Sequence, residues 1–421
     1  MHNKLQKGWS KTTLKEICNM AYGKGLLTKN FSERGYPVFG ANGIIGWYSA
    51  YLYKEPQVII SCRGAASGII HKTVPYSYVT SNSIILKLKS NEVDLDYLQK
   101  SLMSVDKSEI ITGSAQPQIT IEKLNELEIP IAPYAEQQRI VAKLDSLFEK
   151  IEINKKRLEK IPQILKRFRQ SVLAAAIKGR LTTQWRFESG CTEDWENTTL
   201  FDVIEGKAKN GYSAKPVNYE TPFRVLTLTA TTSGIFKPEH FKYFDEKIDP
   251  NSEFWIQPND ILIQRGNTLE YVGVSAVYEG ETNKLIYPDL MIRVRASEKI
   301  LTKYLYYVLS AEKSRNYLRE RATGTAGNMP KINQPTLNSL PIELPSKREQ
   351  EEIVKRVEKL FSFADKVESR YLKAKAQLDK LHQSILAKAF RGELVPQDPE
   401  DEPANLLLER ILTAKRMKKI K

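Results

Sequence analysis

Apolar residues follow a heptad pattern in two long stretches of the chain. The positions that form this pattern are Ile140, Leu144, Leu147, Ile151, Leu158 and Leu165 in the first stretch, and Ile353, Val357, Leu360, Val367, Leu378 and Leu381 in the second. Steps that alternate between four and three residues place side chains on one narrow stripe of a helix, which is typical of a coiled coil. We therefore expect the two helices to pair with each other, antiparallel. The alternative is that each helix packs only on its own domain.

Single residues add detail to these two helices. Asn154 falls on the apolar stripe, where a polar residue can fix the register of a coiled coil. Pro162 predicts a kink or a new helix start near it, and Gly179 and Gly392 predict where the helices end. About 40 residues of helix span roughly 60 Å, so a pair of this length would act as a spacer.

The segments before each helix have a different pattern. Short β-type runs at 57–61, 83–88, 260–263 and 290–294 are separated by turns rich in glycine, asparagine and proline, with helix-like stretches at 95–103 and 301–321. This mixture predicts an α+β domain in each half.

The two halves repeat each other. The segment QSVLAAAIKGRL at 170–181 matches QSILAKAFRGEL at 383–394, and the same offset of 213 residues aligns Glu136-Gln137 with Glu349-Gln350. At smaller offsets Trp9 corresponds to Trp195, Tyr97 to Tyr304, and Arg63-Gly64 is expected to correspond to Arg265-Gly266. The chain is therefore two half-molecules, each a globular part followed by a helix.

These observations predict two α+β domains separated by two long helices that pair as an antiparallel coiled coil with pseudo-two-fold symmetry. The expected boundaries are 1–133 for the first domain, 134–190 for the first spacer, 191–345 for the second domain, 346–396 for the second spacer, and 397–421 for a polar linker with a short helix from Leu406 to Lys419.

Composition narrows the function. The net charge is +14, from 64 basic and 50 acidic residues, and a basic protein without a membrane signal suggests a nucleic-acid partner. Residues 191–345 nevertheless carry 18 basic and 20 acidic residues, so any DNA contact there must come from a local group. The sequence predicts no membrane span and no signal peptide, and three scattered cysteines fit a reducing cytoplasm.

Several glycine-containing loops could bring polar side chains close to DNA. Glycine lets the backbone approach phosphate, and Arg, Asn and Gln can make paired hydrogen bonds to guanine or adenine. The candidate DNA-contacting residues in or beside these loops are Asn42, Arg63, Ser67, Lys72, Ser114, Gln116 and Gln118 in the first half, and Arg265, Asn267, Thr325, Asn328 and Lys331 in the second. For each loop the alternative is an ordinary surface turn.

A search for catalytic motifs finds none. The sequence contains no P-loop, no nucleophile elbow, no clustered His or Cys for a metal, and no Asn/Asp-Pro-Pro-aromatic tetrad for base methylation. We therefore predict no catalytic residues, no metal site and no cofactor in this chain.

The motifs at Pro133–Leu181 and Pro345–Leu394, in combination, resemble the specificity subunit of type I restriction–modification enzymes. Each has a Pro, then Glu-Gln and Ile-Val, then a long helix that closes on Gln-Ser and Gly-x-Leu. The segment Gly35–Gly46 also resembles a common variety of target recognition domain, whereas the second half departs from that variety. The two halves should therefore read different sequences.

The resemblance implies a non-catalytic subunit that reads a split double-stranded DNA target and scaffolds other subunits. Two modification subunits would dock on the helices and bring S-adenosylmethionine, and restriction subunits would bring ATP and Mg²⁺. Off-stripe apolar residues such as Val141, Phe148, Ile164 and Phe361 fit such docking. Two other classes stay open at this point, a stand-alone coiled-coil DNA-binding or regulatory protein and an enzyme with a disguised site.

Overall fold

The computed structural model describes residues 5–113, 115–191, 193–324 and 329–419. The chain forms two compact units, one made of Met1–Glu159 with Lys373–Lys421 and the other of Lys160–Leu372. The long helix α11 (Lys347–Phe390) therefore contributes residues to both units. The first unit is completed by the C-terminal part of the chain.

The recognition domain of the first unit is built on three small sheets. Their strands are β1 (Ser10–Thr13) with β9 (Glu128–Ile131); β2 (Cys18–Tyr22), β8 (Ser83–Leu88), β5 (Val58–Ser61) and β6 (Ile70–Lys72) in that order; and β4 (Gly43–Tyr48), β3 (Tyr36–Gly40) and β7 (Tyr78–Val79). The short helices are α1 (Leu14–Ile17), α2 (Leu95–Ser104), α3 (Ile121–Asn125), η1 (Thr28–Asn30) and η2 (Gly64–Ala66). The neighbours in the four-stranded sheet are all antiparallel.

Apolar residues of the strands explain this arrangement. All four residues of β5 are buried, and so are the first four of β8, because this strand pair is covered on both faces. Helix α2 begins where the side chain of Asp94 accepts a hydrogen bond from the Tyr97 amide. The prediction of a helix at 95–103 is confirmed.

The recognition domain of the second unit repeats the order of the two-stranded and four-stranded sheets. Its three-stranded sheet differs, because its neighbours are all antiparallel, whereas β3 pairs with β7 in parallel. Its strands are β10 (Glu196–Thr199) with β18 (Pro341–Leu344); β11 (Lys209–Asn210), β17 (Met291–Val294), β15 (Ile261–Gln264) and β16 (Ser275–Val277) in that order; and β12 (Pro216–Val217), β14 (Phe241–Phe244) and β13 (Phe223–Leu226). Its helices are α6 (Thr183–Ser189), α7 (Leu200–Val203), α8 (Thr302–Ser310), α9 (Glu312–Glu320), α10 (Gln334–Asn338) and η3 (Leu228–Ala230). The α+β prediction is confirmed.

One element of this domain differs from the expectation. The single helix expected over 301–321 is two helices, α8 and α9, because the backbone of Ala311 is extended. Beyond the break, Leu318 of α9 joins the core of the second unit.

The spacer helices are α4 (Tyr134–Leu158), α5 (Ile161–Ala176) and α11. Pro162 lies in the first turn of α5, so the predicted new start near it is confirmed. Gly179 and Gly392 both have positive φ, at 67° and 75°, a conformation that ends helices and suits glycine.

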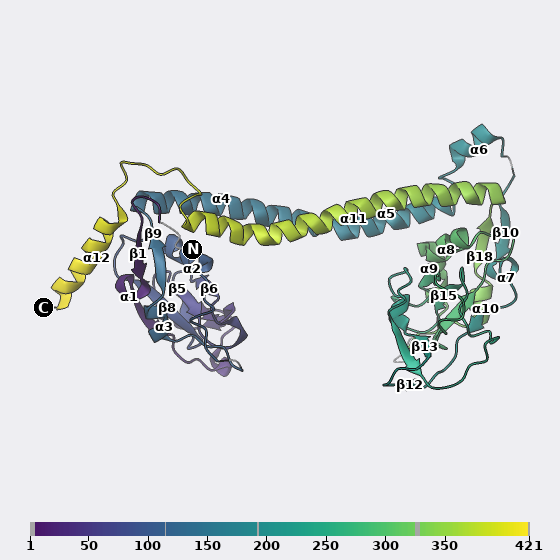
Figure 1. Cartoon of the computed structure of the whole chain (residues 1–421), viewed down its shortest axis with the longest axis horizontal. Helices are drawn as coiled ribbons and strands as arrows, with labels where there is room; N and C mark the ends of the chain where they lie inside the picture. The colour runs from purple at the N-terminus through teal and green to yellow at the C-terminus, as the bar shows by residue number, and fades with distance from the viewer. Residues whose placement is uncertain (1–4, 114, 192, 325–328, 420–421) are drawn as a thin grey trace. The chain divides into compact units, whose positions relative to one another are not determined.

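In each unit α11 runs antiparallel to its neighbour. In the first unit the Phe148 ring stacks on His382, with ring centroids 4.0 Å apart, and Figure 1 shows α4 lying along α11 there. In the second unit Phe168 lies against Phe363, and Arg169 pairs with both Asp365 and Glu368 at 2.7 and 2.8 Å.

Burial varies along the predicted stripe. The fully buried members are Ile140, Leu144, Ile151, Leu165, Ile353 and Val357, and the half-buried ones are Leu147, Leu158, Leu360, Val367 and Leu378. Leu381 lies outside the buried set, with 42% of its surface exposed. The prediction for Asn154 is wrong, because this residue is exposed and lies off the buried stripe.

The C-terminal segment is more than a polar linker. Helix α12 (Ala404–Lys419) places Ala404, Leu407 and Ile411 in the core of the first unit. Two ion pairs, Arg139 with Asp401 and Arg410 with Glu92, hold it there at 2.6 Å each. The segment therefore belongs to the first recognition domain.

Candidate nucleic-acid interface

Three loops meet where β5 ends in the first domain. The Gly64 amide and the Ser67 hydroxyl both donate to the Pro117 carbonyl, at 2.9 and 2.8 Å, which joins the loops at 63–68 and 112–118. The Ser61 hydroxyl donates to the Ala41 carbonyl, and a His71 ring nitrogen lies 3.2 Å from the same oxygen. These contacts bring the loop at 40–43 to the same place, here called the reading end.

Four predicted residues of the reading end are free to contact a ligand. Asn42, Arg63, Gln116 and Gln118 are exposed, and none of the described residues pairs with their side chains. Arg63 and Gln118 face each other in an isolated antiparallel β-bridge.

Two predicted residues of the first domain are already engaged. Ser67 holds the neighbouring loop through Pro117, so its hydroxyl proton is in use. The Lys72 amine pairs with Asp96 of α2. Both have structural partners that the sequence did not reveal, and the structure gives neither of them a free side chain. Ser114 lies outside the described residues.

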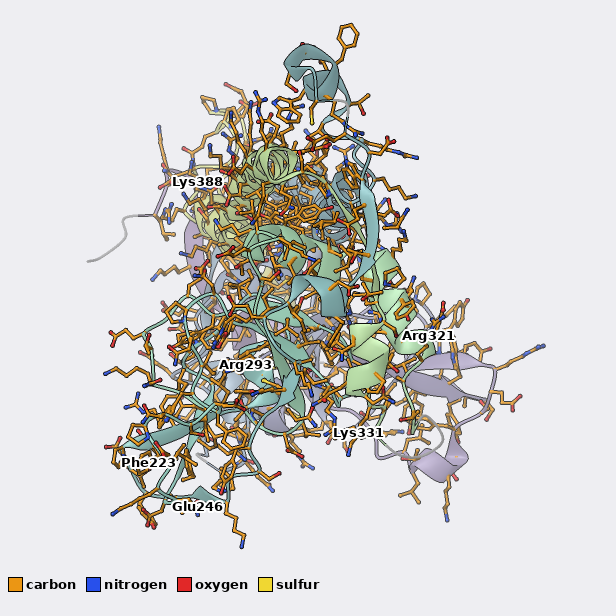
Figure 2. All side chains as sticks on the ribbon, turned by 90° about the vertical axis from the view of Figure 1, so that its right-hand side faces the viewer. Phe223, Glu246, Arg293, Arg321, Lys331 and Lys388 are labelled. Atoms are coloured by element: carbon orange, nitrogen blue, oxygen red, sulfur yellow. The ribbon has the colours of Figure 1, made fainter. Side chains whose placement is uncertain are left out.

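The second domain has the same loop arrangement after β15. Thr323 and Lys331 exchange both backbone hydrogen bonds at 2.9 Å, and the Ile332 amide donates to the Arg265 carbonyl at 2.9 Å. Lys331 is exposed, and its amine has no partner among the residues that the structure describes. Figure 2 shows Lys331 on the side of this domain away from α11.

The expected correspondence of Arg63 with Arg265 is wrong by one residue. Arg63 bridges Gln118, whereas Gly266 bridges Lys331. In agreement, Ser61 pairs with Ser83 in one sheet and Gln264 pairs with Met291 in the other, as the last residues of β5 and β15. Arg63 is thus the equivalent of Gly266, and the shared Arg-Gly dipeptide is a coincidence of local sequence.

Two predicted residues of the second domain are engaged by the protein itself. The Arg265 guanidinium donates to the Asp289 carbonyl at 3.2 Å. The Asn267 amide nitrogen donates to Gln264 at 2.6 Å, and its amide oxygen accepts from the Thr268 amide at 2.7 Å. Asn267 is therefore a turn residue. Thr325 and Asn328 lie outside the described residues.

Two arginines that the sequence analysis missed hold the loop after β15. Arg315 donates to the carbonyls of Glu270 and Val272 at 2.8 and 3.0 Å, and Arg319 donates to Glu270 at 3.3 Å. Burial, together with the nearby positive charge of Arg319, lowers the pKa of Arg315 to about 10. Both residues lie on one face of α9, and only the fold brings that face to the loop.

The Glu-Gln motif joins each helix to its recognition domain. In the first unit Gln137 donates to Ala132 and accepts from the Asp94 amide, and Trp9 donates to Glu136 at 3.0 Å. The second unit repeats this pattern with Gln350, Glu349 and Trp195. All four side chains of the motif are buried, so the motif is a structural joint.

One difference between the joints leaves a buried atom without a partner. In the second unit Thr182 donates to the other oxygen of Glu349 at 2.6 Å. In the first unit Val395 stands at the equivalent position, and Oε1 of Glu136 has no hydrogen-bond partner among the described residues. Burial raises the pKa of Glu136, and the Trp9 hydrogen bond and the Arg139 charge oppose this only in part.

We expect the V395T substitution to raise the free energy of unfolding of the first unit by about 1 kcal/mol, because its hydroxyl would supply the missing donor. When the pKa of a carboxyl group is raised on folding, the folded state becomes less stable as the pH rises and the group ionises. The gain in stability from the V395T substitution should therefore be larger at pH 7 than near pH 4. Urea unfolding at both pH values measures this effect.

The matched control is V141T, which puts a hydroxyl on another half-buried valine of the same core. It should lower stability, because this hydroxyl gains no carboxylate partner. Equal effects from the two substitutions would contradict the assignment.

Within the described parts of the chain there is no group of three or more His, Cys, Asp or Glu residues that could hold a metal ion. Among the described helices, none is long and apolar enough to cross a membrane. What the reading end offers is uncharged amides and cations for hydrogen bonding to a polar ligand.

Comparison with known proteins agrees with this arrangement. The family described as "Type I restriction modification DNA specificity domain" matches residues 6–163 and 192–375. The EcoKI specificity subunit of Escherichia coli K12 is 34% identical over 326 residues, which cover 75% of this chain and 70% of that protein. The EcoDI specificity subunit of Escherichia coli is 28% identical over 442 residues, 97% of this chain and 95% of the relative.

Two solved structures are similar in fold. One, from a study of assembly and conformational transition of the type I system, has a TM-score of 0.67 at 18% identity and covers 93% of this chain and 99% of its own. The other, the HsdS subunit of Thermoanaerobacter tengcongensis, has a TM-score of 0.57 at 18% identity, with 93% and 98% covered.

Proposed function

This chain belongs to the type I restriction–modification DNA specificity family, and we propose that it reads an asymmetric, two-part DNA target with one recognition domain for each half. The observation that carries the proposal is the repeat. Both domains have the same order in their four-stranded sheets and the same bridge at the reading end, but different side chains on that bridge. Two domains of similar fold that present different side chains at the bridge are suited to two half-sites of different sequence.

The reading ends can act by direct readout of base edges. Arg63, Gln118 and Asn42 offer donors and acceptors in the first domain, and Lys331 offers a donor in the second. Phosphate contacts would position the protein, and these side chains would distinguish base pairs in the major groove. The net charge of +14 favours association with DNA, because basic side chains are attracted to the negatively charged phosphate backbone.

The helices would set the unread gap between the half-sites. Helix α11 has 44 residues, about 66 Å at 1.5 Å per residue. Its antiparallel pairing with α4 and α5 would make it a stiff spacer. The gap would then depend on helix length and not on the recognition domains.

The helices would also carry the docking surface for two modification subunits, which would bring S-adenosylmethionine. Ile164, Phe363 and Leu372 are 58–62% exposed on helices of the second unit, which supports such docking. Val141, Phe148 and Phe361 instead pack half-buried against the cores. Restriction subunits would add ATP-driven translocation and Mg²⁺-dependent cutting, so this chain itself would do no chemistry.

Sequencing of methylated adenines tests the proposal. The chain is expressed with its own modification subunits in a host free of other adenine methylation, and again without the chain. We expect one bipartite, asymmetric motif in the first case and none in the second, and stable co-purification with the modification subunits. Methylation by the chain alone, or a continuous motif, would contradict it.

A further inference from the structure

One β-bridge occupies the same position at both reading ends and carries different residues. It joins Arg63 to Gln118 in the first domain and Gly266 to Lys331 in the second, and is called here the reading bridge. The hydrogen bonds beside it are the same. The Ile119 amide donates to Cys62 at 3.0 Å, and the Ile332 amide donates to Arg265 at 2.9 Å.

Each reading bridge carries one long cationic side chain, but on opposite strands. In the first domain the cation is Arg63, which enters the bridge from the loop after β5. In the second it is Lys331, which enters from the segment before α10. Residues that face each other in an antiparallel pair have Cβ atoms about 5 Å apart on the same face, so both cations start from nearly the same place.

The glycine in the second bridge makes this exchange possible. A Cβ atom built on Gly266 would lie 3.2 Å from Cγ of Lys331 and 3.0 Å from Leu290. The stem of Lys331 therefore fills the space that a side chain at 266 would need. Arg63 and Lys331 are alternative occupants of one position in the repeated fold.

The neighbouring cations do not compete for this role. Lys72 pairs with Asp96, and Arg265 donates to Asp289. At both reading bridges the cation has no partner in the described parts of the chain. An exposed Arg or Lys held on a rigid strand pair is suited to guanine, whose O6 and N7 are both acceptors on the major-groove edge.

We propose that the reading bridge is a specificity-determining position in both domains, and that each half-site contains a G·C pair read there, by Arg63 in one half and by Lys331 in the other. The inference rests on the proposed function. Beyond that function, it names the residue that selects one base pair in each half-site, and it names guanine as the selected base.

The test is the methylated motif of the complex with single substitutions. With R63A, discrimination at one G·C pair of one half-site should fall by roughly 5- to 150-fold, so that this position becomes degenerate. K331A should do the same in the other half-site only. R34A and K237A, which remove exposed cations elsewhere in each domain, should leave the motif unchanged.

A transplant gives a second readout. The double substitution R63G/Q118K builds the bridge of the second domain into the first, and it should restore selection of the G·C pair that R63A loses. Q118K alone, with Arg63 still present, should not relax that position.

Each outcome bears on one hypothesis. A bipartite wild-type motif that R63A and K331A leave unchanged, or weaken uniformly without degeneracy, would overturn the reading bridge and leave the proposed function standing. Degeneracy at an A·T pair would also overturn it. Absence of a bipartite motif with the wild-type chain would overturn the proposed function itself.

Discussion

Insertion of one helical turn into each of the two paired spacer segments, α4–α5 and α11, is expected to lengthen the gap in the target and to leave both half-sites unchanged. Four residues inserted after Glu159 and four after Leu372 leave both units intact, because the boundaries of the units fall at these positions. The two positions are also equivalent in the 213-residue repeat. Four residues add about 6 Å of helix, and DNA rises about 3.4 Å per base pair, so the gap should grow by about one to two base pairs.

Methylated-adenine sequencing of the lengthened chain measures this result, since the half-sites and the gap are read from the same motif. The matched control places the four residues in α11 alone. That insertion shifts one helix against its antiparallel neighbour and should reduce methylation at every gap length. An unchanged gap with both insertions would show that the helices do not set it.

Removal of the buried carboxylate of Glu349 is expected to destabilise the second unit by about 3–5 kcal/mol. Glu349 accepts hydrogen bonds from Trp195 at 3.0 Å and from Thr182 at 2.6 Å, and lies 3.4 Å from Arg186. The E349A substitution would leave the half-buried indole N–H of Trp195 without its acceptor, remove the carboxylate that faces the Thr182 hydroxyl and Arg186, and open a gap at the joint between helix and domain. Urea unfolding, with amide exchange followed on β10 and β18, measures the loss.

Two comparisons give this prediction its control. E351A removes an exposed glutamate two residues along the same helix, and its effect should stay within about 0.5 kcal/mol. E136A removes the equivalent carboxylate of the first unit, which accepts from Trp9 but has an unpartnered oxygen, so its cost should be smaller than that of E349A. Equal losses from E349A and E351A would contradict the joint.

Local patterns account for much of the fold. The helix period, the position of Pro162 and the glycines at 179 and 392 predicted the spacer helices and their ends, because these features act within a few residues. The repeat predicted that Trp195 and Glu349 would match Trp9 and Glu136, and the structure gives both pairs the same 3.0 Å hydrogen bond. The purpose of the Glu-Gln motif, however, became clear only from its partners in the fold.

The candidate site was less predictable, because a reader must be free as well as polar. Lys72 and Asn267 have suitable side chains, but both are already paired within the protein. Lys72 pairs with Asp96, and Asn267 forms hydrogen bonds with Gln264 and Thr268. Composition does not record such partners. The match of Arg63 with Arg265 failed for a similar reason, since equivalence is set by strand register, and register depends on pairing between segments far apart in the sequence.

The sequence by itself determined that this chain has two α+β domains, two spacer helices and the family to which they are similar, because periodicity, turns and repeats are properties of neighbouring residues. Only the tertiary structure decided which cations are free and that Arg63 is the equivalent of Gly266. It also decided that the C-terminal helix completes the first domain. These outcomes depend on contacts between distant segments, whose energies no local pattern contains.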